Sequence, residues 1–143
     1  MDRNILFLCT GNSARSQMGE AFLRKLGGKT FHASSAGTEP KGEIFPGVRE
    51  VMREAGFDLS GQRPKGVDEF LGRTHFEKVI IVCDGAEKRC PTIFGPSQRL
   101  FWPFDDPAAA TGSKDEVLAV CRRVRDQIRD SVAAWLAEQG VTG

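Results

Sequence analysis

Residues 5–28, with the sequence ILFLCTGNSARSQMGEAFLRKLGG, decide the fold of this chain. Their first four residues, Ile5 to Leu8, are all apolar, which is typical of a central parallel strand that is buried on both faces. A turn of small and polar residues follows, and then apolar residues recur at helical spacing until two glycines end the helix. Those helical positions are Met18, Ala21, Phe22 and Leu26, and the glycines are Gly27 and Gly28.

The rest of the chain continues this alternation of strands and helices. Further strands are predicted at residues 30–34, 78–83 and 99–102. A helix is predicted from Pro46 to the stop at Gly56, a short one around Val67, Phe70 and Leu71, and a long amphipathic one over Lys114–Glu138. The order predicts a three-layer α/β sandwich with a four-stranded parallel sheet, in a single domain over residues 1–143.

Composition and charge narrow the class of protein. The 143 residues carry 20 basic and 19 acidic side chains, a net charge of +1, so no global field attracts nucleic acid or an anionic membrane. The apolar runs are too short to span a bilayer, and residues 1–4 lead directly into a strand without a signal peptide. We therefore expect a cytoplasmic enzyme or binding domain with no nucleic-acid or membrane partner.

The four cysteines lie at positions 9, 83, 90 and 121. In a reducing compartment structural disulfides are unfavourable, and the absence of a C-x-x-C pair together with only two histidines predicts no metal site. Cys121 falls on the apolar stripe of the long helix, so it is predicted to be a buried core thiol.

The turn after the first strand, Cys9 to Ser16, carries the predicted chemistry. In a doubly wound sheet ligands bind at the carboxyl ends of strands, and a turn into a helix N-terminus directs backbone N–H groups at one anion. The residues predicted to surround a tetrahedral oxyanion are Thr10, Gly11, Asn12, Ser13, Ala14, Arg15 and Ser16. Arg15 adds a planar fork of donors, Ser16 a hydrogen bond to the thiol, and Asn12 braces the loop. Such surroundings lower a thiol pKa, so Cys9 is predicted to be a thiolate nucleophile.

Residues 9–18, CTGNSARSQM, resemble the signature of the low-molecular-weight protein tyrosine phosphatase family, and more closely that of its thioredoxin-coupled arsenate reductase branch. Ser34 to Thr38 resemble the segment after that family's second strand, and Phe104-Asp105-Asp106-Pro107 resembles its acid loop. The resemblance implies that Asp106 is the general acid and Asp105 a supporting residue. A carboxylic acid also suits the chemistry, since the oxygen that leaves a tetrahedral oxyanion must be protonated.

The resemblance extends to Cys83 and Cys90, which are similar to the resolving cysteines of that reductase branch. It implies that Cys9 attacks arsenate, that a Cys9–Cys83 disulfide forms as arsenite leaves, and that Cys90 moves the disulfide to Cys83–Cys90 for reduction by thioredoxin. No cofactor is expected. Glutaredoxin or a small thiol stays open as the reductant. The alternatives are a phosphatase that uses Cys9, Arg15 and Asp106, and an anion sensor without turnover, which needs neither nucleophile nor acid.

The acid loop and the residues behind the anion loop add two further expectations. Pro107 is followed by three alanines and the chain has no tyrosine, which favours a small substrate over phosphotyrosine. Trp102 and Phe104 precede the acid and fit either a pocket wall or the core. Some reductases of this branch hold an alkali cation, and the matching positions here are Asn12, Glu20 and Ser35. The acidic residue that completes that site falls on Gly66, with Asp68 nearby, so the sequence leaves a bound cation open.

Overall fold

The computed structural model describes residues 3–70, 73–82 and 98–140. Four strands form one sheet in the order β2-β1-β3-β4, and every pair of neighbours is parallel. The four-stranded parallel sheet predicted from the sequence is thereby confirmed. The strands are β1 (Asn4–Cys9), β2 (His32–Gly37), β3 (Lys78–Ile81) and β4 (Gln98–Phe101).

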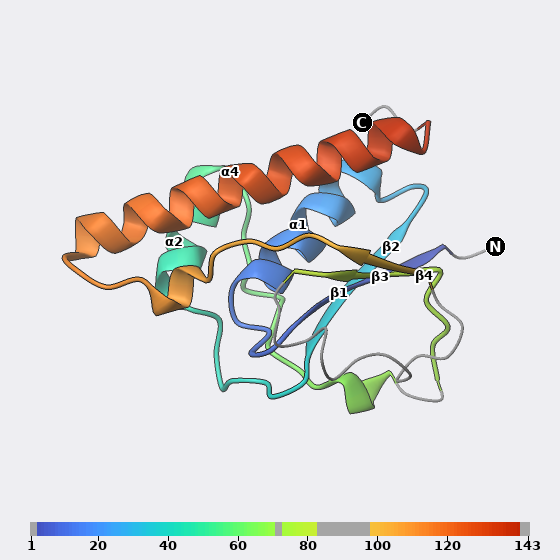
Figure 1. Ribbon diagram of the computed structural model, residues 1–143, viewed down its shortest axis with the longest axis horizontal. Coiled ribbons are helices and arrows are strands. Elements are labelled where there is room, and N and C mark those ends of the chain that lie inside the picture. Colours follow the sequence, from blue (N-terminus) through green and yellow to red (C-terminus); the bar gives the residue numbers. More distant parts are fainter. Residues whose placement is uncertain (1–2, 71–72, 83–97, 141–143) are drawn as a thin grey trace.

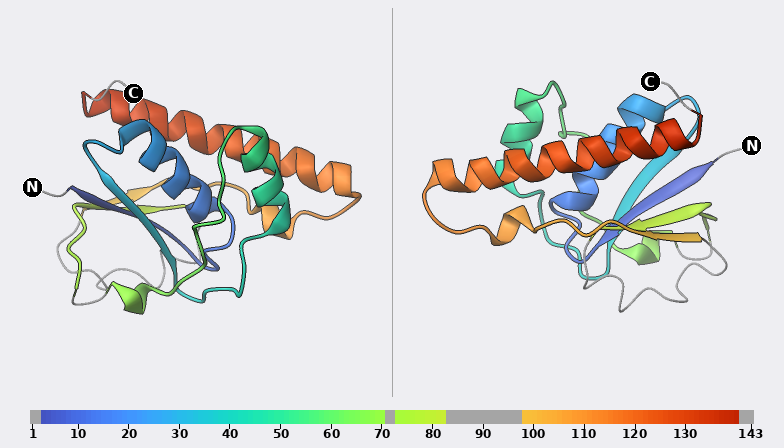
Figure 2. Two further views of the ribbon diagram at one scale, coloured as in Figure 1. Left: turned by 180° about the vertical axis from the view of Figure 1, so that it is seen from behind. Right: turned by 45° about the horizontal axis from the view of Figure 1, so that its top comes forward.

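Helices cover the sheet unequally in the described part of the chain. Three helices, α1 (Arg15–Gly27), α2 (Pro46–Glu54) and α4 (Lys114–Glu138), lie together on one side of the sheet, and α4 crosses the other two (Figure 1). The 3₁₀ turn η1 (Val67–Glu69) lies on the opposite side in all three views of Figures 1 and 2. A second 3₁₀ turn, η2 (Pro107–Ala109), precedes α4.

The core forms around β1 because this strand lies between β2 and β3. Its residues Ile5 to Leu8 have no exposed surface. Leu6 and Leu8 alternate with Ile5 and Phe7, so both faces of the strand are apolar and both are covered. At the carboxyl end of this rigid strand the chain turns sharply into α1, and Cys9 is fixed at the turn.

The long helix α4 has the predicted bounds. Ser113 caps its N-terminus, where Ser113 Oγ accepts from the Glu116 N–H at 3.1 Å and the Glu116 carboxylate accepts from the Ser113 N–H at 3.2 Å. Cys121 is fully buried on its apolar stripe, as predicted, and burial raises the pKa of its thiol. Among the described residues, no helix is both long enough and apolar enough to cross a membrane.

The second strand was predicted with the wrong bounds. It covers His32–Gly37 rather than residues 30–34, so most of the segment that was expected to follow the strand belongs to it. Ser35, Ala36 and Gly37 have weak strand propensity, but they pair in register with Phe7, Leu8 and Cys9. Pairing with a central strand therefore outweighs local preference.

Smaller differences affect the other predicted elements. β3 ends at Ile81, although the N–H of Val82 still donates to the Leu8 carbonyl oxygen at 3.0 Å, and the predicted end at Cys83 lies outside the described residues. β4 begins at Gln98 and ends at Phe101, one residue earlier than predicted at each end. The short helix is only a 3₁₀ turn without buried residues; Phe70 follows it and packs edge-on against Phe76, while Leu71 lies outside the described residues.

Candidate active site

A pocket of about 330 Å³ opens at the carboxyl end of β1. One side is the loop between β1 and α1, and the other is formed by the connection after β2 and by the turn before η2. Its lining residues are Cys9, Thr10, Gly11, Ser13, Ala14, Arg15, Glu39, Lys41 and Asp106. The structure therefore brings together the predicted nucleophile, arginine and acid, which are separated by up to 97 positions in the sequence.

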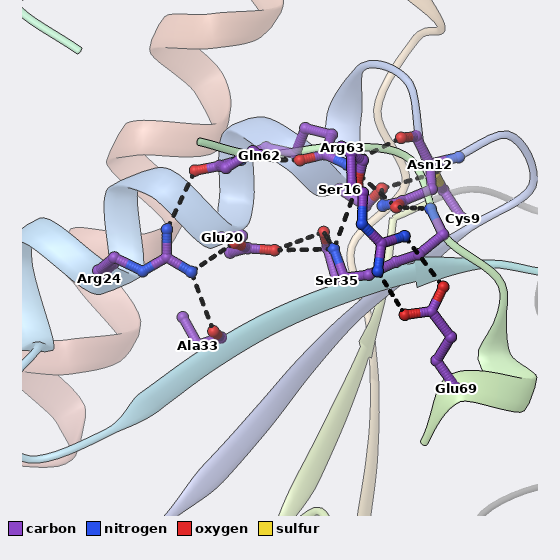
Figure 3. Close-up of polar contacts among 12 residues, drawn as sticks. Cys9, Asn12, Ser16, Glu20, Arg24, Ala33, Ser35, Gln62, Arg63 and Glu69 are labelled. Carbon is purple, nitrogen blue, oxygen red and sulfur yellow. Dashed lines mark hydrogen bonds and ion pairs between the residues drawn. The ribbon is translucent and has the colours of Figure 1, made fainter. Parts of the chain in front are cut away.

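Cys9 lies at the base of this pocket with 2% of its surface exposed. The N–H of Asn12 donates to Cys9 Sγ at 3.1 Å, and Ser16 Oγ lies 2.8 Å from the same sulfur. Asn12 Nδ2 donates to Ser16 Oγ at 2.8 Å, so the hydroxyl hydrogen of Ser16 remains for the sulfur (Figure 3). Both donors favour a negatively charged sulfur, and the predicted Ser16 contact is present.

Asn12 and Ser16 were predicted around the oxyanion, but neither lines the pocket in the described part of the chain. Both are fully buried behind the loop. The backbone of Asn12 has a φ of 50°, a left-handed conformation that asparagine tolerates better than most residues. This conformation belongs to the turn that points the Asn12 N–H at Cys9. The two residues thus support the sulfur rather than surround the ligand.

A segment far along the sequence fixes the side chain of Asn12. Its Oδ1 accepts from the N–H of Lys65 at 2.9 Å and from Gln17 Nε2 at 3.0 Å. Gln17 is itself fully buried. Its Nε2 donates to the Arg63 carbonyl oxygen at 2.9 Å, and its Oε1 accepts from Gln62 Nε2 at 2.7 Å. Residues 62–65 therefore brace the loop from behind, a contact that the sequence analysis missed because no periodic pattern marks this segment.

Arg15 begins α1 and reaches across the pocket. It donates through one terminal nitrogen to the Phe104 carbonyl oxygen at 3.0 Å, and the other terminal nitrogen lies 3.6 Å from Asp106 Oδ2. Its Nε is buried and has no hydrogen-bond partner among the described residues. In the part of the chain that the structure describes, no side chain caps the helix start at Ala14. A buried unsatisfied donor and the open N–H groups of a helix N-terminus together suit a bound anion.

The adjacent carboxylates of Asp105 and Asp106 differ in position. Asp106 lines the pocket, and its Oδ1 accepts from the N–H of Ala108 at 3.0 Å, which fixes the carboxylate at the start of η2. The side chain of Asp105 is 72% exposed and pairs with Arg123 at 3.2 Å on the surface. Of these two neighbouring carboxylates, Asp106 is the one placed to exchange a proton with a ligand beside Cys9.

Two aromatic residues before the acid lie away from the pocket lining, in the part of the chain that the structure describes. Trp102 packs against Phe7 of the core with ring centroids 6.2 Å apart. Phe104 packs on the core as well and contributes its carbonyl oxygen to Arg15. Of the two roles that the sequence left open, packing is the one observed.

Glu39 and Lys41 line the pocket and were not predicted. They follow β2 in a connection whose backbone runs along the anion loop: the N–H of Glu39 donates to the Thr10 carbonyl oxygen and that of Lys41 to the Gly11 carbonyl oxygen, both at 2.9 Å. The Lys41 stem lies over Gly11. No sequence signal marks these residues, because only the tertiary approach of two loops brings them to the site.

Behind the loop, Glu20 is a buried carboxylate with 4% of its surface exposed. Ser35 Oγ donates to it at 2.6 Å, and Arg24 contacts it from the surface (Figure 3). Lys65 Nζ lies 3.6 Å from its Oε1. Burial lowers the pKa of Lys65, and Glu20 opposes that shift. The place where the family resemblance suggested an alkali cation thus holds a lysine ammonium.

Cys83 and Cys90, the predicted resolving cysteines, lie outside the described residues. A parallel α/β fold with a cysteine, an arginine and a carboxylate around a small anion pocket defines a class of proteins that process tetrahedral oxyanions at a thiol. Comparison with known proteins identifies the family within that class. The chain belongs to the low molecular weight phosphotyrosine protein phosphatase family, which matches residues 4–141.

Several relatives are similar to this protein over almost the whole length of the chain. An arsenate reductase of Halalkalibacterium halodurans is 40% identical over 136 residues, which are 95% of this chain and 96% of that protein. An arsenate reductase of Bacillus subtilis is 39% identical over 136 residues, with the same coverage.

Solved structures agree with the family assignment. One of an arsenate reductase in a phosphate-binding state superposes with a TM-score of 0.80 at 29% identity, covering 95% of this chain and 98% of that one. A mutant of YwlE from Bacillus subtilis also has a TM-score of 0.80, covering 97% of this chain and 99% of that one; at 18% identity it shows the shared fold alone.

Proposed function

We propose that this chain reduces arsenate to arsenite, with Cys9 as the nucleophile. The observation that carries the proposal is the pocket itself, which is lined by Cys9, by Asp106 and by Arg15, whose Nε has no hydrogen-bond partner among the described residues. The arsenate reductases that are about 40% identical to this chain over nearly its whole length support this substrate. Cytoplasm, where thiols are kept reduced, is the compartment that suits it.

The first step places the oxyanion between the loop amides and Arg15. The Cys9 thiolate attacks arsenic and an S–As bond forms, while one As–O bond breaks. Asp106 gives its proton to the departing oxygen, which leaves as water. Arg15 and the N–H groups of the loop hold the remaining oxygens and stabilise the charge that develops on them.

The second step transfers two electrons to arsenic. In the proposed relay Cys83 attacks the sulfur of Cys9, an S–S bond forms, and the S–As bond breaks so that its electron pair leaves with arsenic as arsenite. Cys90 then attacks Cys83 and releases the Cys9 thiolate. A dithiol of the thioredoxin class reduces the Cys83–Cys90 disulfide. Two thiols are oxidised for each arsenate reduced, so the balance closes without a cofactor.

A phosphatase activity is the second candidate, because Cys9, Arg15 and Asp106 suffice for phosphoester hydrolysis when water attacks the cysteine adduct. The composition of the pocket separates the substrates of the two activities. None of its described lining residues is aromatic, and four of them are charged: Arg15, Glu39, Lys41 and Asp106. Such walls favour a small inorganic oxyanion over the ring of phosphotyrosine, which needs an apolar slot.

The test measures arsenite release with thioredoxin, thioredoxin reductase and NADPH, beside hydrolysis of p-nitrophenyl phosphate. Wild type is expected to release arsenite over many turnovers. Cys9→Ser should lose both activities because a hydroxyl is not ionised at neutral pH, whereas Cys83→Ser should lose only arsenate reduction. Hydrolysis without arsenite release would instead support the phosphatase, and anion binding with neither activity would support a sensor.

A further inference from the structure

Behind the anion loop, Glu20 places a buried negative charge that has no role in the pocket chemistry described above. A carboxylate with 4% exposure needs a compensating charge. Ser35 is neutral, and the side chain of Arg24 is 55% exposed, so water screens its charge. Among the described residues Lys65 is the remaining cation beside Glu20, and its side chain is only 15% exposed.

The ammonium of Lys65 is held from three directions. It lies 3.6 Å from Glu20 Oε1, 3.5 Å from Ser35 Oγ and 3.3 Å from the carbonyl oxygen of Arg63. Burial lowers the pKa of this amine and the charge of Arg63 adds to that shift, while the carboxylates of Glu20 and Glu69 oppose it, Glu20 more strongly. Glu20 is therefore the main group that favours a charged lysine at this position, and the ammonium in turn balances the Glu20 carboxylate.

The main chain of Lys65 connects this pair to the thiol. Its N–H donates to Asn12 Oδ1 at 2.9 Å, Asn12 Nδ2 donates to Ser16 Oγ at 2.8 Å, and Ser16 Oγ lies 2.8 Å from Cys9 Sγ. The Lys65 carbonyl oxygen also accepts from the N–H of Gly37 at 2.9 Å. Three consecutive hydrogen bonds thus join Lys65 to the sulfur of the nucleophile.

We propose that Lys65 is a positioning residue for the oxyanion loop. Its ammonium supplies the fixed positive charge that balances Glu20, and its backbone holds the chain of donors that ends at Cys9. Without the ammonium, the Glu20 carboxylate would add an uncompensated negative charge behind a loop that has to stabilise a thiolate and bind an anion. Cys9 would then ionise less readily.

The experiment measures alkylation of Cys9 by iodoacetamide as a function of pH, with the Cys9 peptide quantified by mass spectrometry. In Lys65→Ala the midpoint of the profile should move to higher pH by about half to one unit, so alkylation below the midpoint slows about three- to tenfold. The charged groups that face Cys9 in the pocket are unchanged in the variant. They are Arg15, Glu39, Lys41 and Asp106.

Chemical rescue separates the lost charge from a general structural defect. Ammonium chloride should restore the profile of Lys65→Ala, because the small cation fits the space left between Glu20 and Ser35, whereas tetramethylammonium chloride at the same ionic strength should not. Lys25→Ala, an exposed lysine of α1, is the matched control and should behave as wild type. If Lys65→Ala does not fold, Lys65→Met keeps the stem and should show the same shift.

An unshifted alkylation profile in the folded variant would overturn the proposal, as would an equal response to both salts in Lys65→Ala. The proposed function enters only through the role of Cys9 as nucleophile. Alkylation requires no arsenate, so the result holds whether the enzyme is a reductase or a phosphatase. Failure of arsenate turnover in wild type would refute the proposed function and leave the Lys65 result unaffected.

Discussion

Gly37→Ala should damage the anion loop from the side of β2. An ideal Cβ on Gly37 would lie 2.4 Å from the Thr10 carbonyl oxygen and 3.0 Å from the Asn12 nitrogen. Both atoms belong to the backbone of the loop, so no side chain can rotate out of the way. Relieving the closer contact moves β2 and the loop apart by at least about 0.6 Å, since real Cβ atoms do not come nearer than 3.0 Å.

The cost of that movement follows from the packing around it. Gly37 is buried and pairs with Cys9, so the strain falls on the central ladder of the sheet. Overpacking of this kind destabilises by about 1–3 kcal/mol, which for a chain of this length lowers the melting temperature by about 3–10 °C. A misplacement of about 1 Å at an active site can reduce catalysis by about 10²-fold, so we expect a loss of kcat/KM between about tenfold and that limit.

Thermal unfolding and arsenate reduction of the purified variant test both parts. Gly61→Ala is the control, because a Cβ there meets no atom within 4 Å and the residue is exposed; its stability should change by less than about 0.5 kcal/mol. A Gly37→Ala enzyme with the melting temperature and kcat/KM of wild type would refute the close approach of β2 to the loop.

Two further predictions concern the chemistry. Asp106→Asn should lower kcat by about 10²–10⁴-fold with a smaller change in KM. Asp105→Asn should have little effect, because of the two carboxylates Asp106 is the one that lines the pocket. Steady-state kinetics that show the reverse order would contradict this choice of acid. Cys90→Ser should release one arsenite per chain and then hold a Cys9–Cys83 disulfide, which mass-spectrometric mapping would detect. Phosphoester hydrolysis by this variant should continue. Repeated thioredoxin-coupled turnover by the variant would exclude the relay.

The part of the fold that local pattern controls was predictable. Ile5 to Leu8 form a buried strand because four consecutive apolar residues leave no polar face, and α4 begins and ends where its capping box and apolar stripe indicate. The end of β2 was not predictable from propensity. Its small residues are poor strand formers, and only the pairing with β1 extends the strand to Gly37.

The residues of the candidate site also divide into those that a local motif predicts and those whose place depends on tertiary contacts. Cys9 and Arg15 belong to one contiguous motif that predicts an anion loop, and Asp106 belongs to a second one whose resemblance to the family's acid loop implies a general acid. Lys65 was missed because it contacts Asn12 through a backbone N–H, a group that every residue except proline carries. Lys41 was missed because its place in the pocket depends on how the connection after β2 lies along the loop.

The bracing of the loop has a consequence for how this family can diversify. The described contacts that hold Asn12 and Ser16 come from within the loop, from α1 and from residues 62–65. Cys83 and Cys90 belong to a different stretch of sequence from the segments that supply these described contacts. Under the proposed relay, an ancestor could therefore exchange hydrolysis for reduction by acquiring two thiols in one segment, while the described contacts that hold Asn12 and Ser16 stay the same.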